Sequence, residues 1–416
     1  MTDFPVPKIK PFKGIRPNAQ FVNRVVLEVE NLNLETAKAI RAENPYSYVN
    51  MLVPKVDNKF LRGSKRELAF KKINENFEDF LENGILIRDS KPSHYVYRIK
   101  HRGIVQTGIW TSTSIDDYLN NTVKKHELTR ADRENALIDY LQQTGVDANP
   151  VLITYPKDNT INTLIENRVH CKPDLDFSTS EAEHKLWKID EEADVNKLTQ
   201  AFAVLPVTYI ADGHHRAAAA SLLGIERRRL NLKHKGDEEY NFFTSVYMAA
   251  DQLEILEFNR LVKDTGSYLK EQFLSQLSES FEVTTSETAI KPSHLHEFGM
   301  YLKDSWYHLA ALPHSYNQEN PVSELDVTIL QDYLLDPVLK IADPRTDSRI
   351  AFLGGVTPVE ELMKMVDDGD FAVAFTLFPT SIDQLISVAD AGEVMPPKST
   401  WFEPKFQAGL VVHQIN

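Results

Sequence analysis

A short apolar strand that passes directly into an alanine-rich helix constrains the fold of this chain more than any other feature. Residues 207–210 are apolar and β-prone, and residues 216–223 predict a helix that ends at Gly224. Residues 212–215, Asp-Gly-His-His, form the turn between them. A strand and a helix joined this closely, among further mixed strands and helices, predict an α/β fold with mixed sheets.

The turn carries the chemistry of an anion site. Gly213 lets the backbone approach a ligand closely, and the first N–H groups of the helix point outward with the positive end of the helix dipole behind them. His214, His215 and Arg216 make the turn more electropositive, and a guanidinium grips phosphate oxygens with two parallel hydrogen bonds. We therefore predict that these four residues bind phosphate, and that Asp212 beside them is a base or a metal ligand.

Two other interpretations of the turn remain open. In the first, Asp212 caps the helix while the histidines pack and hydrogen-bond internally. In the second, Asp212, His214 and His215 bind a metal ion, since carboxylate and imidazole are ordinary ligands. Adjacent histidines at a helix start point in different directions, so the metal site is the less favoured interpretation.

The composition excludes several classes of partner. A formal net charge of −14 and a pI near 5.4 argue against general attraction to nucleic acid or to anionic membranes. No apolar run approaches the length of a membrane span, and the first residues lack the pattern of a signal peptide. The single cysteine, Cys171, fits a reducing compartment. We expect a cytoplasmic protein.

The length of 416 residues predicts two or three compact units. We expect an N-terminal α/β region at 1–110, a central core at 111–265 that contains the turn, and a C-terminal α/β domain at 266–416. The predicted strands and helices that matter below lie at 24–30 (strand), 95–99 and 105–110 (hairpin), 129–145 (helix), 151–155 (strand), 324–335 (helix) and 371–378 (strand). Trp110, Trp187 and Trp306 are assigned to cores.

Several segments resemble the bacterial proteins of domain-of-unknown-function family 1015. The resemblance extends over nearly the whole chain and rests on residues 9–17, 125–127 with Thr129, 186–187, 259–264, 325–327 and 395–402. The family usually carries Pro-Pro-Tyr-Asp-Val near the N-terminus, where this chain has Val-Val-Leu-Glu at residues 25–28. The Lys-Glu-x-Asp-Arg segment of the family is replaced here by residues 133–137, Arg-Glu-Asn-Ala-Leu.

The Asp-Gly-His-His-Arg segment at 212–216 is also similar to the signature of the ParB and sulfiredoxin-like superfamily. Members of that superfamily bind nucleotide phosphates at the equivalent turn, and they include kinases of free serine. The resemblance implies a ParB/sulfiredoxin-like nucleotide-binding core with additional α/β domains. It further implies an ATP- or ADP-dependent phosphotransferase that acts on a small hydroxyl compound, with free L-serine as the leading candidate.

Such a kinase needs a phosphate cradle, a cation such as Mg²⁺, and a base for the attacking hydroxyl. Glu127 and Asp212 are the candidate bases, with His126 in support, and Asp212 is the candidate metal ligand. An ion pair with Lys124 or Lys125 is the alternative role for Glu127. The candidate substrate-binding residues are Asn259, Arg260, Lys398, Ser399, Thr400 and Lys405. Their alternative roles are a strand-end ion pair for the first two and a structural plug around residues 396–402 for the others.

Three functions compete at this point. The first is the small-molecule kinase, whose partners are a nucleotide and a small hydroxy amino acid and for which a homodimer is considered. The second is a nucleotide sensor that has lost turnover, which the altered segments at 25–28 and 133–137 motivate. The third is a metal-dependent hydrolase that uses Asp212 and the two histidines.

Overall fold

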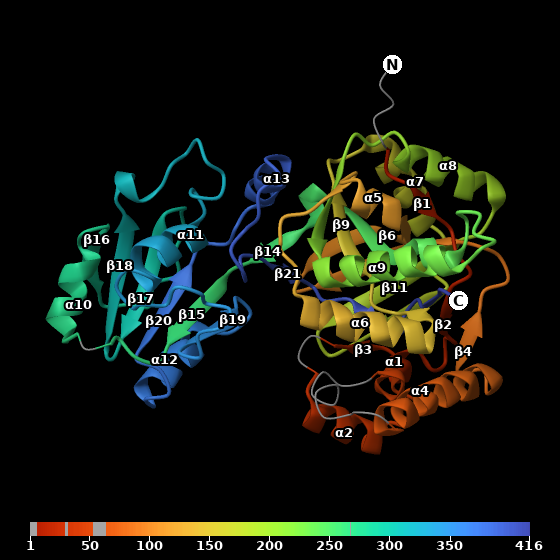
Figure 1. Ribbon diagram of the computed structural model, residues 1–416, viewed down its shortest axis with the longest axis horizontal. Coiled ribbons are helices and arrows are strands. Elements are labelled where there is room, and N and C mark those ends of the chain that lie inside the picture. Colours follow the sequence, from red (N-terminus) through yellow and green to blue (C-terminus); the bar gives the residue numbers. More distant parts are fainter. Residues whose placement is uncertain (1–5, 30–31, 53–63, 267) are drawn as a thin grey trace. The chain divides into compact units, whose positions relative to one another are not determined.

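The computed structural model describes residues 6–29, 32–52, 64–266 and 268–416, and it divides into two compact units (Figure 1). Unit 1 comprises residues 1–253 and 404–416, and unit 2 comprises residues 254–403. This division differs from the one expected from the sequence in three respects. The boundary lies between residues 253 and 254 rather than 265 and 266, so Asn259 and Arg260 belong to unit 2. Residues 1–110 and 111–253 belong to one unit, and residues 404–416 return to it after unit 2.

Unit 1 is built on a nine-stranded sheet with the order β10-β11-β5-β6-β13-β9-β12-β7, in which β1 also pairs with β6. The strands are β1 (Ile9–Lys10), β5 (His94–His101), β6 (Ile104–Ser114), β7 (Val123–Lys124), β9 (Val151–Tyr155), β10 (Leu175–Ser178), β11 (Ala182–Ile189), β12 (Thr208–Asp212) and β13 (Phe242–Ala249). The β12–β7 and β13–β9 pairs are parallel, and the β12–β9 pair is antiparallel. The predicted mixed α/β class is confirmed.

Local patterns placed several of these strands correctly. The hairpin of β5 and β6 and the strand β9 lie where the sequence predicts them. The strand predicted at 24–30 is wrong in its first part, since α1 (Val22–Val25) is helical there, while β3 (Leu27–Glu28) follows. Residue 30 lies outside the described residues. Trp110 and Trp187 are buried in unit 1 and Trp306 in unit 2, as predicted.

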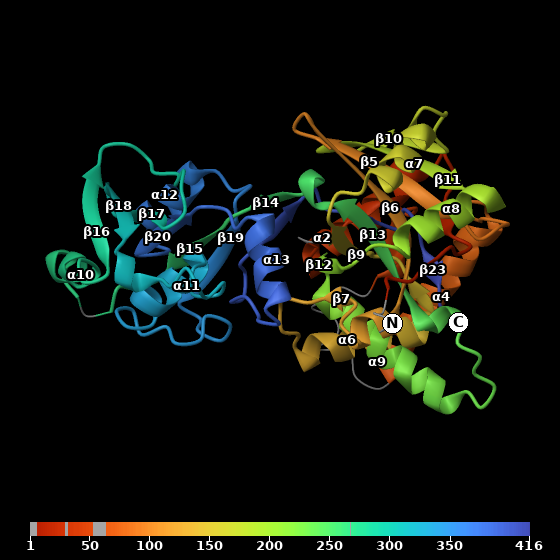
Figure 2. The same ribbon diagram turned by 90° about the horizontal axis from the view of Figure 1, so that it is seen from above.

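The helices of unit 1 cover this sheet and extend the core. They are α2 (Leu34–Glu43), α4 (Ser64–Glu82), α5 (Ile115–Leu119), α6 (Ala131–Thr144), α7 (Asn159–Val169), α8 (Glu192–Phe202) and α9 (His214–Leu230). α6 ends at Gly145, whose φ of 67° is the left-handed conformation of a helix C-cap. Both views show α9 lying alongside α6 (Figures 1 and 2).

α9 continues past the glycine where the sequence predicts its end. Gly224 lies buried inside the helix, where an added Cβ would lie 2.4 Å from Cδ1 of Ile115 and 2.7 Å from the carbonyl oxygen of Tyr240. The glycine therefore allows close packing rather than ending the helix, and the helix stops at Leu230. The prediction of a C-cap at this position is wrong.

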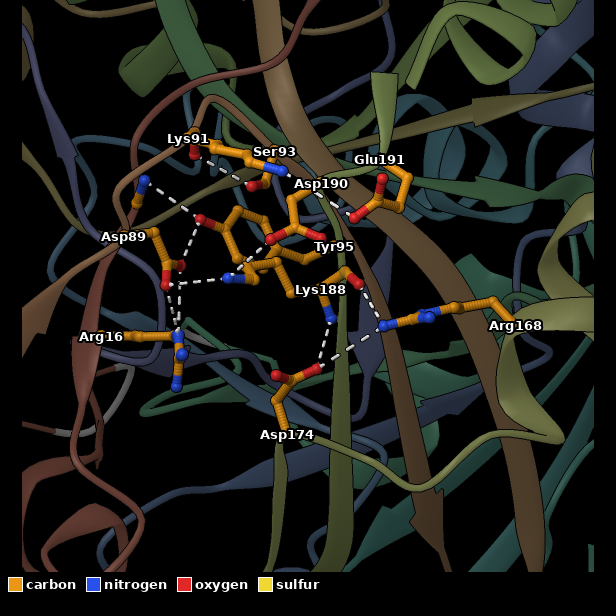
Figure 3. A network of polar contacts seen from close by, with 11 residues as sticks. Arg16, Asp89, Lys91, Ser93, Tyr95, Arg168, Asp174, Lys188, Asp190 and Glu191 are labelled. Carbon is orange, nitrogen blue, oxygen red and sulfur yellow. Dashed lines mark hydrogen bonds and ion pairs between the residues drawn. The ribbon is translucent and has the colours of Figure 1, made fainter. Parts of the chain in front are cut away.

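A buried polar network ties the segment 9–17 into unit 1 (Figure 3). Asp89 is 5% exposed; its carboxylate accepts hydrogen bonds from Nε of Arg16 at 3.1–3.2 Å and from the hydroxyl of Tyr95 at 2.9 Å. Nζ of Lys188 lies 3.6 Å away. Gly14 donates its N–H to the Tyr95 oxygen at 3.0 Å, and a Cβ at this glycine would lie 2.2 Å from that oxygen. The arginine and glycine of this family segment thus have a structural role.

Residues 404–416 complete unit 1 with short strand pairs. β22 (Gln407–Ala408) pairs with β3, and β23 (His413–Gln414) pairs with β8 (Val146–Asp147). Val412 exchanges main-chain hydrogen bonds with Ile15, which lies in the short strand β2 (Ile15–Pro17) beside β4 (Leu86–Arg88). Figure 1 shows this blue segment among the red and orange elements of unit 1.

Unit 2 has a six-stranded sheet of order β16-β18-β17-β20-β15-β19, which Figure 2 shows side by side. Its strands are β15 (Phe258–Val262), β16 (Phe281–Ser286), β17 (Glu297–Leu302), β18 (Ser305–Ala311), β19 (Ile350–Gly354) and β20 (Val373–Leu377), with a separate pair of β14 (Glu254–Leu256) and β21 (Trp401–Glu403). Its helices are α10 (Lys270–Leu277), α11 (Asp326–Leu330) with a π turn (Gln331–Leu335), α12 (Val359–Asp367) and α13 (Ile382–Asp390). The helix expected at 324–335 and the strand expected at 371–378 lie close to these bounds.

Within the described ranges, no helix combines the length and the apolar character needed to cross a bilayer.

Candidate phosphate-binding site

The predicted turn is present at the junction of β12 and α9. Gly213 occupies the N-cap position with φ of 102° and ψ of 25°, a left-handed conformation that favours glycine. Its carbonyl oxygen accepts the N–H groups of Arg216 at 2.9 Å and Ala217 at 3.1 Å. The N–H groups of His214 and His215 precede these and have no acceptor within the helix by α-helical geometry. The turn therefore offers main-chain donors at the positive end of a 17-residue helix.

Asp212 is held in place by positive groups. Its Oδ2 accepts a hydrogen bond from Nη2 of Arg216 at 2.8 Å, and its side chain is 44% exposed. Burial by itself would raise the pKa of Asp212, but Arg216, Lys405 and the Gly213 N–H together hold that pKa below its ordinary value. The carboxylate is therefore ionised at neutral pH. The structure thus brings the predicted residue Lys405 into the electrostatic environment of the turn.

The guanidinium of Arg216 is bonded to protein oxygens. Besides Asp212, it donates to Oδ1 of Asn149 at 3.0 Å and to the carbonyl oxygen of Pro150. These bonds join the turn to the loop that precedes β9. The prediction that this guanidinium binds phosphate rests on its chemistry alone, and the proximity of residues 149–150 to the turn is visible only in the structure. In this structure Arg216 shapes the turn, and Asn149 is a site neighbour that the sequence analysis missed.

The parallel pairing of β7 with β12 places residues 125–127 beside the turn. Thr208 is opposite Val123 and Tyr209 is opposite Lys124, so both strands run toward the same sheet edge. His126 then lies against His214, with ring centroids 4.4 Å apart at 83°. Residues 125–127, which are distant from the turn along the sequence, therefore lie beside it.

Both of these histidines are buried and neutral. The main-chain N–H of His126 donates to Nε2 of His214 at 3.4 Å, which assigns the His214 proton to Nδ1. Burial lowers the pKa of His126 to about 4, against the opposing effects of Asp212 and of a hydrogen bond to the carbonyl of Ile210. Burial also lowers the pKa of His214, and the neighbouring His126 adds to the shift.

Glu127 faces this neutral pair from the solvent side. Its Oε2 lies 3.5 Å from Nδ1 of His214, and its side chain is 42% exposed. The ammonium of Lys125 donates to the carbonyl oxygen of Tyr118 at 3.0 Å and lies 4.4 Å from the Tyr118 ring centre. His214 is thus a neighbour of Glu127 that the sequence did not indicate.

His215 points to a different neighbour. Its Nε2 accepts the main-chain N–H of Arg130 at 3.1 Å, and burial together with Arg133 lowers its pKa. His214 and His215 thus diverge, as helix geometry requires. Among the residues that the structure describes, no group of three or more His, Cys, Asp and Glu side chains has the arrangement of a metal site.

The other predicted substrate-binding residues lie in unit 2. Asn259 and Arg260 are on β15, 1% and 3% exposed, and Oδ1 of Asn259 accepts the N–H of Leu377 at 3.3 Å. Nη2 of Arg260 donates to the carbonyl oxygen of Lys398 at 3.0 Å, which brings these two predicted residues together. Their role in binding a substrate stays a prediction.

Ser399 and Thr400 continue the same loop. The Ser399 hydroxyl donates to the carbonyl oxygen of Pro396 at 2.6 Å, and its own carbonyl oxygen accepts the hydroxyl of Thr380 at 3.0 Å. Ser399 is buried and Thr400 is half-buried. These hydrogen bonds of Ser399 stabilise the conformation of the loop, so its hydroxyl has a structural role here.

A protein-family model described as "Protein of unknown function (DUF1015)" matches residues 9–328. The chain belongs to the DUF1015 family. The turn, residues 125–127 and Arg260 all lie within the matched region. No curated protein sequence matches the chain significantly.

Solved structures resemble this DUF1015 chain at low identity. A mutant of a free serine kinase in complex with ADP is 14% identical, with a TM-score of 0.37 over 72% of this chain and 88% of that chain. The free serine kinase in complex with AMP is 14% identical, with a TM-score of 0.35 over 71% and 86%. SbnI with a C-terminal truncation, from Staphylococcus aureus, is 10% identical, with a TM-score of 0.34 over 72% and 85%. Likenesses of this degree carry no information on function.

Proposed function

We propose that the turn at residues 212–216 binds the phosphates of ATP or ADP, and that the protein transfers a phosphoryl group to a small hydroxyl compound. The carrying observation is the left-handed Gly213 at the start of α9, with Glu127 and His214 3.5 Å apart beside it. The N–H groups of His214 and His215 supply donors for phosphate oxygens, and Lys405 adds positive charge near Asp212. Free L-serine is the leading acceptor, which follows from the resemblance of residues 212–216 to the kinase-containing superfamily.

Glu127 is the proposed general base in this mechanism. An exposed carboxylate accepts the proton of the attacking hydroxyl as the oxygen approaches the transferred phosphorus. Nδ1 of neutral His214, which carries the proton, lies 3.5 Å from Oε2 of Glu127, so a small movement of the carboxylate would let it accept that proton as a hydrogen bond. His126 acts through His214, because its main-chain N–H fixes the His214 tautomer. His126 is therefore a positioning residue.

Asp212 is the proposed contact for Mg²⁺. Magnesium is commonly bound through one or two carboxylates together with substrate phosphates and waters, so a single ionised, 44% exposed carboxylate at the turn fits the ion. When bound, the ion would neutralise charge on the transferred phosphate. The ion pair between Asp212 and Arg216 makes Asp212 a weaker base than Glu127, because the pair stabilises the ionised form of Asp212.

The deciding experiment separates binding from transfer. Purified full-length protein is incubated with Mg²⁺, ATP or ADP and a panel of hydroxy amino acids, and phosphorylated products are measured by ³¹P NMR. Nucleotide binding is measured in parallel by calorimetry. Product formation with saturable binding is the expected result; an absence of binding to both nucleotides contradicts the whole proposal.

The variant Glu127→Gln tests the assignment of the base. We expect turnover to fall by about 10²- to 10⁴-fold, the usual contribution of a general base, while nucleotide affinity is unchanged. The carboxylate is partly exposed, so the substitution should not disturb folding. Glu226→Gln, an exposed carboxylate on α9, is the matched control and should keep full activity. Equal activity of the two variants would remove Glu127 from the mechanism.

A nucleotide sensor is the second candidate. The observation that favours it is the internal bonding of Arg216, since this guanidinium is bonded to Asp212, Asn149 and Pro150. Saturable nucleotide binding with no product from any acceptor would support the sensor and rule out the kinase.

A further inference from the structure

Arg260 is a buried guanidinium at the centre of unit 2. Its strand β15 lies between β20 and β19, and the residue is 3% exposed. It donates to the carbonyl oxygens of Phe258 and Lys398, the latter at 3.0 Å, and its central carbon lies 5.4 Å from the ring centre of Phe352. A guanidinium has about five N–H donors. Main-chain oxygens therefore satisfy only part of its capacity.

No Asp or Glu side chain pairs with Arg260 among the residues described. Other arginines of unit 2 have such partners, for example Arg345 with Asp343 and Arg349 with Asp347, both at 2.9 Å or less. Burial lowers the pKa of Arg260 to about 9, and no charged neighbour opposes this effect. An unpaired buried charge is unfavourable for folding. Its presence calls for an explanation beyond stability.

The loop residue whose carbonyl oxygen contacts Arg260 is itself a cation, Lys398, and it has an unusual backbone conformation. Lys398 has a φ of 60°, the left-handed region that few residues other than glycine adopt. Its carbonyl oxygen faces Arg260, while its ammonium lies 4.9 Å from the ring centre of Phe258. The hydrogen bonds of Ser399 fix the loop in this form. Lys398 is exposed, so solvent reaches this side of the group.

We propose that Arg260 and Lys398 form an oxyanion site in unit 2 that binds the carboxylate or phosphate group of a small molecule. The planar fork of a guanidinium matches both groups with two parallel hydrogen bonds, and the ammonium adds a second positive charge. A bound anion supplies to Arg260 the negative charge that no Asp or Glu side chain among the described residues supplies. This site does not depend on the nucleotide site proposed for unit 1.

Trp401 provides a local signal for the test. Its ring packs edge-on against Phe258, with ring centres 5.2 Å apart, and Phe258 lies under the Lys398 ammonium. The full-length protein is titrated with sodium phosphate and, separately, with sodium acetate at constant ionic strength, while tryptophan emission is recorded. A saturable change that disappears in Trp401→Phe assigns the response to unit 2. The anion that binds more tightly identifies the ligand class.

Substitutions of the two cations then test the assignment. We expect Arg260→Met and Lys398→Met each to weaken the response about tenfold or more, since both remove charged hydrogen-bond donors. Arg345→Met, which removes an exposed arginine of the same unit, should leave the affinity unchanged. Lys405→Met alters the unit 1 site only and should also leave the response intact.

Thermal unfolding distinguishes ligand binding from a purely structural clip. If Arg260 serves the anion, Arg260→Met unfolds at the same or a higher temperature than the wild type without anion, and phosphate no longer stabilises it. Equal destabilisation of Arg260→Met with and without anion overturns the proposal, as does a wild type with no saturable response to either anion. If Arg260→Met does not fold, Lys398→Met decides: unchanged affinity contradicts the site, and a tenfold loss supports it.

Discussion

Gly213 combines two demands that other residue types do not meet together. Its φ of 102° lies in the left-handed region, and a Cβ at this position would lie 3.0 Å from the Arg216 guanidinium. The glycine therefore sets both the direction of α9 and the place of the guanidinium that bonds Asp212. The shape of the proposed phosphate cradle depends on the absence of this single side-chain atom.

Gly213→Ala tests this dependence. We expect the free energy of unfolding of unit 1 to fall by about 1–3 kcal/mol, because alanine is strained at this φ. Nucleotide affinity should fall as well, measured by calorimetry. Gly103→Ala is the matched control: its φ is 83° and its surroundings are open, so it carries the strain without touching the site. An unaltered affinity in Gly213→Ala would separate the turn from nucleotide binding.

The buried histidines predict an acid-sensitive stability. The pKa of His126 in the folded protein is about 4 against an ordinary value near 6.5. Because folding lowers this pKa, its contribution is fully present above pH 6.5 and is lost as the pH falls toward 4, by about 3 kcal/mol in total. Urea unfolding at pH 7, 6 and 5 measures the loss.

His126→Gln isolates this residue from the other histidines. His94 and His184 are also buried, with pKa values lowered by burial to about 3 and 4, so the wild type loses stability through several groups at once. The main-chain N–H that contacts His214 is kept in this variant. We expect the variant to lose less stability on acidification than the wild type, and parallel curves would contradict the assignment.

At the scale of elements, local sequence specified the strand β12, the turn and the start of α9, since each depends on neighbouring residues. It did not specify where α9 ends, because the role of Gly224 depends on Ile115 and Tyr240, which come from other elements. The pairing of β7 with β12 is similarly non-local, and with it the approach of Glu127 to His214. The residue types at the turn could therefore be read from the sequence, but the contacts between those residues could not.

Gly224→Ala tests the packing of α9. Alanine has the higher helix propensity, by about 1 kcal/mol, but its Cβ would lie 2.7 Å from a main-chain oxygen. We expect a net loss of about 1–3 kcal/mol in the free energy of unfolding, the usual cost of overpacking. Glu226→Ala, exposed on the same helix, should change stability by less than about 0.5 kcal/mol. A more stable Gly224→Ala protein would show that the helix moves without cost.

At the scale of the whole molecule, the sequence predicted the α/β class because strand and helix patterns are frequent along the chain. The division into units was harder to predict, because prolines and glycines in the sequence mark loops. They do not show whether a later segment of the chain packs back onto an earlier unit. Residues 404–416 begin directly after β21 with Pro404, Lys405 and Phe406, and nothing in this short sequence marks a return to unit 1. The pairing of β22 with β3, of β23 with β8 and of Val412 with Ile15 reveals that this segment is part of unit 1.

The return of this segment sets an order of events during synthesis. The strands β3 and β8 are synthesised early, but residues 407–414, which pair with them, are synthesised only after all of unit 2. Until residues 404–416 are synthesised, Ile15 and β8 in unit 1 therefore lack their strand partners. Unit 2, in contrast, is one continuous stretch of the chain that contains all the strands of its own sheet. Translation speed through residues 254–403 thus determines how long the larger unit stays incomplete.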